Sequence, residues 1–126
     1  MTKTILITKF NFSISIEDLK KIMPSVAPEF SEIPGCYWKI WLMNEDHKEA
    51  GGIYLFESST ELEQYLKSDL FASVVNNPAF SDLQTSMFHV MEPASAITGA
   101  PLLKGLSRSK FQNFRLTGPL AIELAP

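Results

Sequence analysis

The chain has two histidines, and each has the chemistry of a general base. The unperturbed pKa of a histidine side chain is near 6.5, which lets it take up a proton at neutral pH. His89 stands between Phe88 and Val90, where a buried histidine with a satisfied hydrogen bond is the structural alternative. His47 lies in the charged segment EDHKE, where the alternative is a solvated surface group.

Aromatic side chains and one amide add to these candidates. Trp38 and Trp41 stand three residues apart in the segment YWKIWLMN, which ends at Asn44, and Tyr54 follows in the segment AGGIYLF. Each has a structural explanation. The tryptophans can be core or interface residues, Tyr54 a core residue with a bonded hydroxyl, and Asn44 the end of a hairpin strand.

Other catalytic classes lack their motifs. The histidines and the single cysteine, Cys36, lie far apart without the spacing of metal ligands. Neither a G-x-x-x-x-G-K-[ST] loop nor a G-x-G-x-x-G motif is present. No Ser/His/Asp or Cys/His pairing stands out, and Cys36 reads as a small strand residue. We therefore expect neither a metal nor a cofactor.

Composition indicates one globular domain of ordinary size. Of the 126 residues, 45% are apolar and 20% are charged, and the net charge is −3. A negative chain is a poor partner for nucleic acid or an anionic membrane, because both need a basic surface. One cysteine excludes an internal disulfide, no apolar run has the length of a membrane helix, and the N-terminus lacks a signal-peptide pattern. A cytoplasmic protein is expected.

Hydrophobic periodicity predicts the order strand, helix, strand, strand, helix, strand. Strands are expected over residues 3–12, 36–44, 50–56 and 83–91. The first helix starts at Ser15 and contains Pro24 and Pro28, which predict a kink or a division into two pieces. The second starts after Ser58 and continues to Val75. This order is typical of an α+β, ferredoxin-like βαββαβ domain, with both helices on one face of an antiparallel sheet.

The predicted sheet carries more apolar side chains than two helices cover. Alternation places Trp38, Ile40 and Leu42 on one face and Tyr37, Trp41 and Met43 on the other. A bare face would expose more than the few hundred Å² that monomers tolerate. We therefore expect a homodimer with sheet against sheet, one tryptophan facing the helices and the other the partner. Alternation alone leaves open which tryptophan does which.

The end of the sequence differs from the rest. We expect a domain over residues 1–96 and an extension over residues 97–126. The segment from 94 onward is rich in glycine and proline and has a net charge of +3, against −6 for residues 1–93. It also keeps six large apolar residues. We expect an arm that docks on an acidic surface of this chain or of a neighbour, and a partly ordered extension is the alternative.

Two paired motifs resemble the YdhR-type monooxygenase family. The segments PGCYWKIW (34–41) and HKEAGGIYLF (47–56) are similar to a PG-x-x-W-K-x-W and H-x-A-G-G-I-Y-L-F pair of that family. One spacing differs, since Lys48 separates the histidine from the glutamate. The segment FHVMEPAS (88–95) also resembles the family, and the resemblance covers roughly residues 4–96.

The resemblance implies a dimeric α+β barrel with a pocket between sheet and helices. It also implies a cofactor-independent monooxygenase that acts on an aromatic or quinone-like small molecule. Such an enzyme deprotonates a phenol or hydroquinone, binds the anion and keeps the ring dry while oxygen reacts. The candidate residues are His89 and Asn44 for catalysis, and Trp38, Trp41, Tyr54 and His47 for substrate binding.

A fold that supports many chemistries leaves alternatives open. A non-catalytic homodimer that binds a small hydrophobic ligand fits the same pocket, as does an isomerase or decarboxylase of the barrel group. In related barrels that degrade haem, the resemblance implies a site made of an asparagine, a tryptophan and a histidine that lies on a helix. Neither His47 nor His89 falls on a predicted helix.

Overall fold

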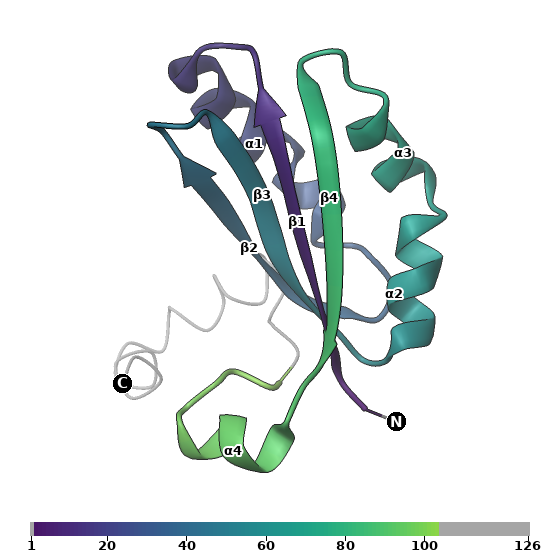
Figure 1. Cartoon of the computed structure of the whole chain (residues 1–126). Coiled ribbons are helices and arrows are strands. Elements are labelled where there is room, and N and C mark those ends of the chain that lie inside the picture. Colours follow the sequence, from purple (N-terminus) through teal and green to yellow (C-terminus); the bar gives the residue numbers. More distant parts are fainter. Residues whose placement is uncertain (1, 104–126) are drawn as a thin grey trace, which may run out of the picture.

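A computed structural model of the chain describes residues 2–103 (Figure 1). The elements in order are β1 (Thr4–Phe12), α1 (Ile16–Phe30), β2 (Cys36–Asn44), β3 (Glu49–Phe56), α2 (Ser59–Leu66), α3 (Asp69–Val75), β4 (Phe80–His89) and α4 (Glu92–Ile97). The strands form one antiparallel sheet in the order β2-β3-β1-β4. Helices α1, α2 and α3 lie on one side of this sheet, and α4 follows beyond the end of β4 (Figure 1). The predicted ferredoxin-like α+β fold is confirmed.

The first helix forms where its cap predicts. The hydroxyl of Ser15 accepts a hydrogen bond from the backbone N–H of Asp18 at 3.1 Å, which satisfies one free donor of the first turn. Pro24 and Pro28 both lie inside α1, which is nevertheless one continuous element over 15 residues. The helix is thus not divided into two pieces, and the alternative outcome, a kink, stays a prediction; each proline removes one backbone donor from the helix.

The second predicted helix is two helices, because a serine starts a new one. The hydroxyl of Ser68 donates to the carbonyl of Tyr65 at 2.6 Å and accepts from the N–H of Phe71 at 3.2 Å, ending α2 and capping α3. The fourth strand also begins earlier than predicted, at Phe80. A short helix that was not predicted, α4, spans the boundary placed between residues 96 and 97.

Strand register assigns the two tryptophans to different faces. Trp41 is opposite Gly52 on β3, on the helix side, and its ring meets the edge of Phe30 in α1 at a centroid distance of 5.0 Å. Trp38 is opposite Leu55 and lies on the other face. A bulge between Cys36 and Trp38 takes Tyr37 out of the expected alternation.

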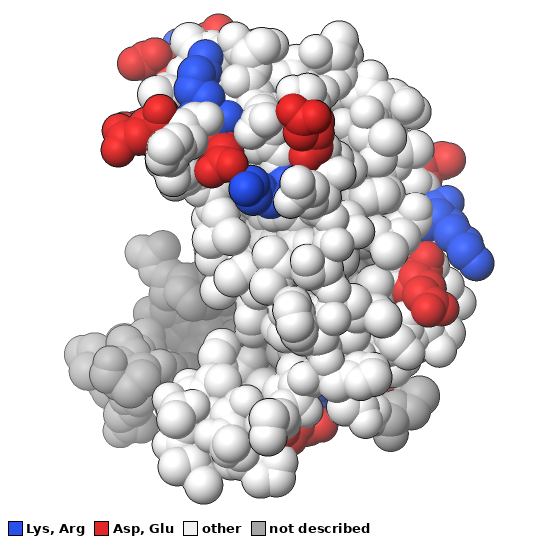
Figure 2. Space-filling model, in the orientation of Figure 1, with Lys and Arg blue, Asp and Glu red and all other residues white. Residues whose placement is uncertain are grey.

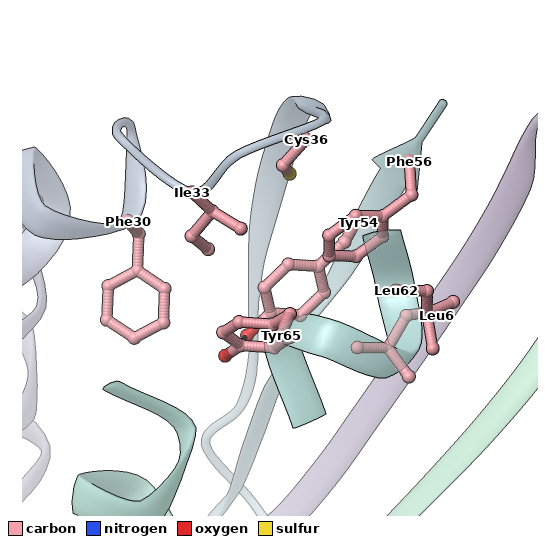
Figure 3. Packing of buried hydrophobic residues seen from close by; sticks show 8 residues of the cluster. All are labelled: Leu6, Phe30, Ile33, Cys36, Tyr54, Phe56, Leu62 and Tyr65. Carbon is pink, nitrogen blue, oxygen red and sulfur yellow. Dashed lines mark hydrogen bonds between the residues drawn. The ribbon is translucent and has the colours of Figure 1, made fainter. Parts of the chain in front are cut away.

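The core lies between the sheet and its helices (Figure 3). Phe56 has no exposed surface, and Leu6, Leu62 and Tyr54 are nearly as buried. Each side chain of this kind contributes roughly 1.5–3 kcal/mol when fully buried. The cluster therefore fixes α2 and β3 against each other and holds the site described below.

The opposite face of the sheet remains apolar and accessible. Ile40, Leu42 and Phe88 are 48%, 40% and 58% exposed. Charged side chains instead gather at the end of the sheet where the β2–β3 turn lies (Figure 2). Two ion pairs tie that end together, Lys9 with Glu49 at 2.9 Å and Lys20 with Glu45 at 3.0 Å.

Candidate active site between the sheet and its helices

A cavity of about 110 Å³ lies between the sheet and the helices α1, α2 and α3. Its volume is comparable to that of an engineered cavity of about 150 Å³ that takes up benzene. The lining is mostly apolar. Its polar groups include Lys39 of β2, Tyr54 of β3 and Tyr65 of α2. An apolar cavity with a few convergent polar groups is the usual form of a small-molecule site.

Lys39 lies on the helix side of β2, opposite Tyr54 of β3. Its Nζ is 3.4 Å from the ring centroid of Trp41, 3.8 Å from that of Phe30 and 4.7 Å from that of Tyr54. All three rings are within the distance of about 6 Å at which a ring attracts a cation. Among residues 2–103, no carboxylate forms an ion pair with Lys39. Within the described part of the chain, aromatic faces rather than carboxylates therefore hold the ammonium group.

Burial changes the proton affinity of this amine. Loss of solvent lowers the pKa of Lys39 from 10.5 to about 7, and the nearby Cys36 acts in the opposite direction. A lysine with this pKa is about half neutral at neutral pH, and its free electron pair can take a proton or attack a carbon atom. Burial also raises the pKa of the Cys36 thiol to about 11, so that this thiol stays protonated.

Two glycines of β3 make room for this arrangement. A Cβ atom at Gly52 would lie 2.6 Å from Cε of Lys39. Because glycine has no Cβ atom, the side chain of Lys39 can pass over β3 at this position. A Cβ atom at Gly51 would lie 1.9 Å from the carbonyl oxygen of Thr8 in β1. A side chain thus approaches closely at Gly52, and a backbone approaches closely at Gly51.

A pair of tyrosine hydroxyls forms the second polar feature. The hydroxyls of Tyr54 and Tyr65 are hydrogen-bonded at 3.0 Å and buried. Both lie on the side of the cluster that faces Phe30 (Figure 3). Burial raises the pKa of each phenol, so that both stay protonated at neutral pH. One hydroxyl donates to the other, which leaves the second with a proton to donate.

The structure brings two of the residues suggested by the sequence into this cavity, Trp41 and Tyr54. Trp38 is on the opposite face, where its Nε1–H donates to the carbonyl of Pro101 at 2.7 Å. That contact places residues 100–103 beside the open face of the sheet. The predicted docking arm otherwise falls on residues 104–126, outside the described residues.

The other three lie at the two ends of the sheet and do not line the cavity. Asn44 and His47 are exposed at the β2–β3 turn, where the backbone N–H of His47 donates to Oδ1 of Asn44 at 3.4 Å. His89 is exposed at the opposite end, paired with Thr4. The register separates the two ends by seven residues of β1, about 23 Å along the sheet. The roles suggested for these residues stay predictions.

Three residues of the site that were not among the candidates from the sequence are Lys39, Tyr65 and Phe30. Lys39 carries a usable signal, because it stands two residues before Trp41 and shares its face of the strand. A lysine on the covered face of a strand is unusual, since lysine is seldom buried without a partner. For Tyr65 and Phe30, the helical apolar pattern indicates burial and nothing more.

Two further features of the described residues bear on the class of site. No group of three His, Cys, Asp or Glu side chains within residues 2–103 is arranged to hold a metal ion. Over the same residues, each helix is too short or too polar to cross a membrane. Both histidines lie outside the helices, His47 in a turn and His89 in β4.

A protein-family model described as "Putative mono-oxygenase ydhR" matches residues 5–101. The match includes every residue that lines the cavity. The comparison with curated proteins gave no significant match.

Solved structures share the fold at low sequence identity. The cofactor-independent oxygenase SnoaB from Streptomyces nogalater is 14% identical with a TM-score of 0.59, and the alignment covers 73% of this chain and 96% of that one. The heme-degrader MhuD from Mycobacterium tuberculosis, solved with two hemes in its active site, is 15% identical with a TM-score of 0.57, covering 70% and 95%. Protein NE2512 of unknown function from Nitrosomonas europaea is 16% identical with a TM-score of 0.60, covering 72% and 91%. The chain has the subunit fold of the dimeric α+β barrel proteins.

Proposed function

The chain belongs to the YdhR mono-oxygenase family, and from that premise we propose that it oxygenates a small hydroxylated aromatic molecule in the cavity between sheet and helices. The proposed substrates are hydroquinones and anthrones, and the proposed reaction uses no metal or flavin. The observation that carries this proposal is Lys39, an amine without a carboxylate partner among the described residues, enclosed by three aromatic rings.

The amine and the rings suit the two requirements of such a reaction, which are a base for the phenolic proton and a site without water. The neutral amine of Lys39 takes the proton of a phenolic hydroxyl, and the resulting ammonium group stays beside the anion. The apolar walls exclude water, so that this ion pair is stronger than it would be in solution. The free proton of the Tyr54–Tyr65 pair can be donated to the same substrate oxygen.

For an anthrone, the balance of the reaction is simple. Loss of one proton from the CH2 carbon opposite the carbonyl gives an electron-rich anion. Dioxygen adds to that carbon, and the peroxide takes the proton back from the base to give a hydroperoxide. That carbon then loses its second proton, the O–O bond breaks and water leaves. One oxygen atom ends as a quinone carbonyl and the other in water, with the carbon as the oxidised centre and dioxygen as the oxidant. The protein supplies the base, the anion contacts and a dry site.

We also propose that the protein is a homodimer in the cytoplasm. The open face of the sheet presents Ile40, Leu42 and Phe88, and packing on a second copy would remove these side chains from water. Cys36 is buried and free, as is usual for a protein in a reducing compartment.

Oxygen uptake with a panel of hydroquinones and anthrones tests the function. We expect the wild type to consume oxygen faster than the uncatalysed control, and Lys39→Met to lose about 100-fold or more of that rate. The matched control is Lys67→Met, an exposed lysine at the end of α2. His89→Ala tests the role suggested by the sequence.

Two results would contradict the proposal. If the wild type consumes no oxygen while a ligand still quenches tryptophan fluorescence, the protein is a non-catalytic binding protein. If Lys39→Met keeps full activity and His89→Ala loses it, the chemistry takes place at the other end of the sheet.

A further inference from the structure

We propose that the side-chain amine of Lys39 is a nucleophile that forms a reversible imine with small aromatic aldehydes and ketones that enter the cavity. This inference goes beyond oxygenation, because it concerns a covalent bond between the protein and a carbonyl compound. It requires no oxygen and no substrate hydroxyl. It depends on where the amine lies and on what surrounds it.

The surroundings of the amine favour attack on a carbonyl carbon. Lys39 lines the cavity, and its Nζ is held between Trp41 and Phe30 at 3.4 and 3.8 Å from the ring centroids. Gly52 leaves open the path along which the side chain crosses β3, which fixes its direction. An aromatic aldehyde entering the same cavity would place its ring against apolar walls. Because the ring is held, its carbonyl carbon meets the amine repeatedly in a restricted orientation.

The protonation states needed for imine formation coexist at neutral pH. Imine formation requires an amine that is not protonated, and burial lowers the pKa of Lys39 to about 7. It also requires a weak acid that assists the departure of water. The hydroxyls of Tyr54 and Tyr65 stay protonated, because burial raises the pKa of both. Of the other ionisable groups, Cys36 acts on Lys39 and its thiol stays protonated, and the exposed Glu29 lines the same cavity.

The step balances without an oxidant or reductant. The electron pair of Nζ forms a C–N bond, and the carbonyl oxygen takes up a proton. The nitrogen then loses its remaining proton, the C–O bond breaks and one water molecule leaves. The product is a C=N bond between Lys39 and the former carbonyl carbon. Hydrolysis reverses the reaction, which makes the adduct transient unless it is reduced.

Reductive trapping tests this inference in the absence of oxygen. The full-length protein is incubated at pH 7 with benzaldehyde and cyanoborohydride, and the labelled sites are quantified by peptide mass spectrometry at successive times. A solvated lysine has a pKa near 10.4, so that its neutral fraction at pH 7 is roughly a thousand times smaller than that of an amine with a pKa of 7. A weaker intrinsic nucleophilicity offsets part of this difference. We expect Lys39 to be benzylated at least about tenfold faster than the exposed Lys67.

The internal comparison makes the test independent of any variant. Labelling of Lys39 no faster than that of Lys67 would overturn the inference, whether or not the protein consumes oxygen. Lys39→Arg keeps the charge and removes the nucleophile, and we expect the fast phase to disappear while labelling of exposed lysines is unchanged. A fast phase that persists in this variant would identify another amine, such as the N-terminus, and would also overturn the inference.

Discussion

Replacing Lys39 by methionine should stabilise the folded protein below pH 7, and the gain should shrink as the pH rises. Methionine keeps a similar length and apolar stem but has no charge. Burial lowers the pKa of Lys39 from 10.5 to about 7, which at about 1.4 kcal/mol per pKa unit corresponds to about 5 kcal/mol against the charged form. The protein therefore carries a penalty at this position whenever the lysine is charged.

At pH 6, about one unit below the folded pKa, nearly all of this penalty is present. We therefore expect Lys39→Met to raise the free energy of unfolding by about 5 kcal/mol at pH 6. A methionine that fills the same volume should add little strain.

The direction of the pH dependence follows from proton binding. Between pH 7 and about 10, the unfolded chain keeps a proton on Lys39 that the folded chain has lost, so that the stability of the wild type rises with pH. The variant has no such group. The difference between the two should therefore fall from about 5 kcal/mol at pH 6 to about 1 kcal/mol at pH 10.

Urea unfolding of the wild type and Lys39→Met at several pH values measures this difference directly, since all other titrating groups are common to both proteins. Lys67→Met is the control, and its effect should be small and constant with pH. A difference for Lys39→Met that is independent of pH would refute the reasoning. A loss of several kcal/mol at pH 6 would show that the aromatic rings hold the charge more strongly than burial opposes it.

Three further predictions concern the cavity and the open face. Gly52→Ala should lower oxygen uptake about tenfold, because the new methyl group meets Cε of Lys39 at 2.6 Å and must displace it; unchanged activity would show that the lysine need not lie on this path. Oxygen uptake should rise with pH through about 7 as Lys39 loses its proton and level off above it, and a profile that falls over this range would exclude the neutral amine as the base. Sedimentation at micromolar concentration should give about twice the chain mass of 14.1 kDa, and Ile40→Glu on the open face should reduce it to one chain mass; a wild type that sediments as a single chain would exclude the homodimer.

The order of the elements was predictable, because each has a strong local pattern. The alternation of β1 and the apolar runs of β2 and β3 are visible in the sequence, and Ser15 marks the start of α1. The division between α2 and α3 was missed, since the apolar spacing continues through Ser68. Only the hydrogen bonds of Ser68 in the folded chain show that one helix ends and another begins there.

The site was less predictable, because it depends on residues brought together by the fold. Alternation along β2 places Lys39 and Trp41 on one face, but the second ring around the amine comes from Phe30 of α1 and the third from Tyr54 of β3. A sequence gives no distances between these elements. The residue types also point to the wrong base. Histidine is the usual candidate base at neutral pH, and lysine becomes one only when it is buried.

Strand register explains why the earlier candidates separate. Asn44 and His89 are both at strand ends and could have met at one edge of a sheet. The pairing of β1 with its two neighbours instead places them at opposite ends. Trp38 and Trp41 separate for a different reason, since three residues along a strand change the face.

A direct titration of Lys39 by NMR, with a carbon-13 label at Cε, tests the central claim that an aromatic cavity holds a lysine that is partly neutral at physiological pH. The resonance is assigned by its absence in Lys39→Arg. We predict a midpoint at about pH 7 in the folded protein. A midpoint at or above pH 10 would contradict the account, because Lys39 could then serve neither as the base for a phenol nor as a nucleophile for a carbonyl compound.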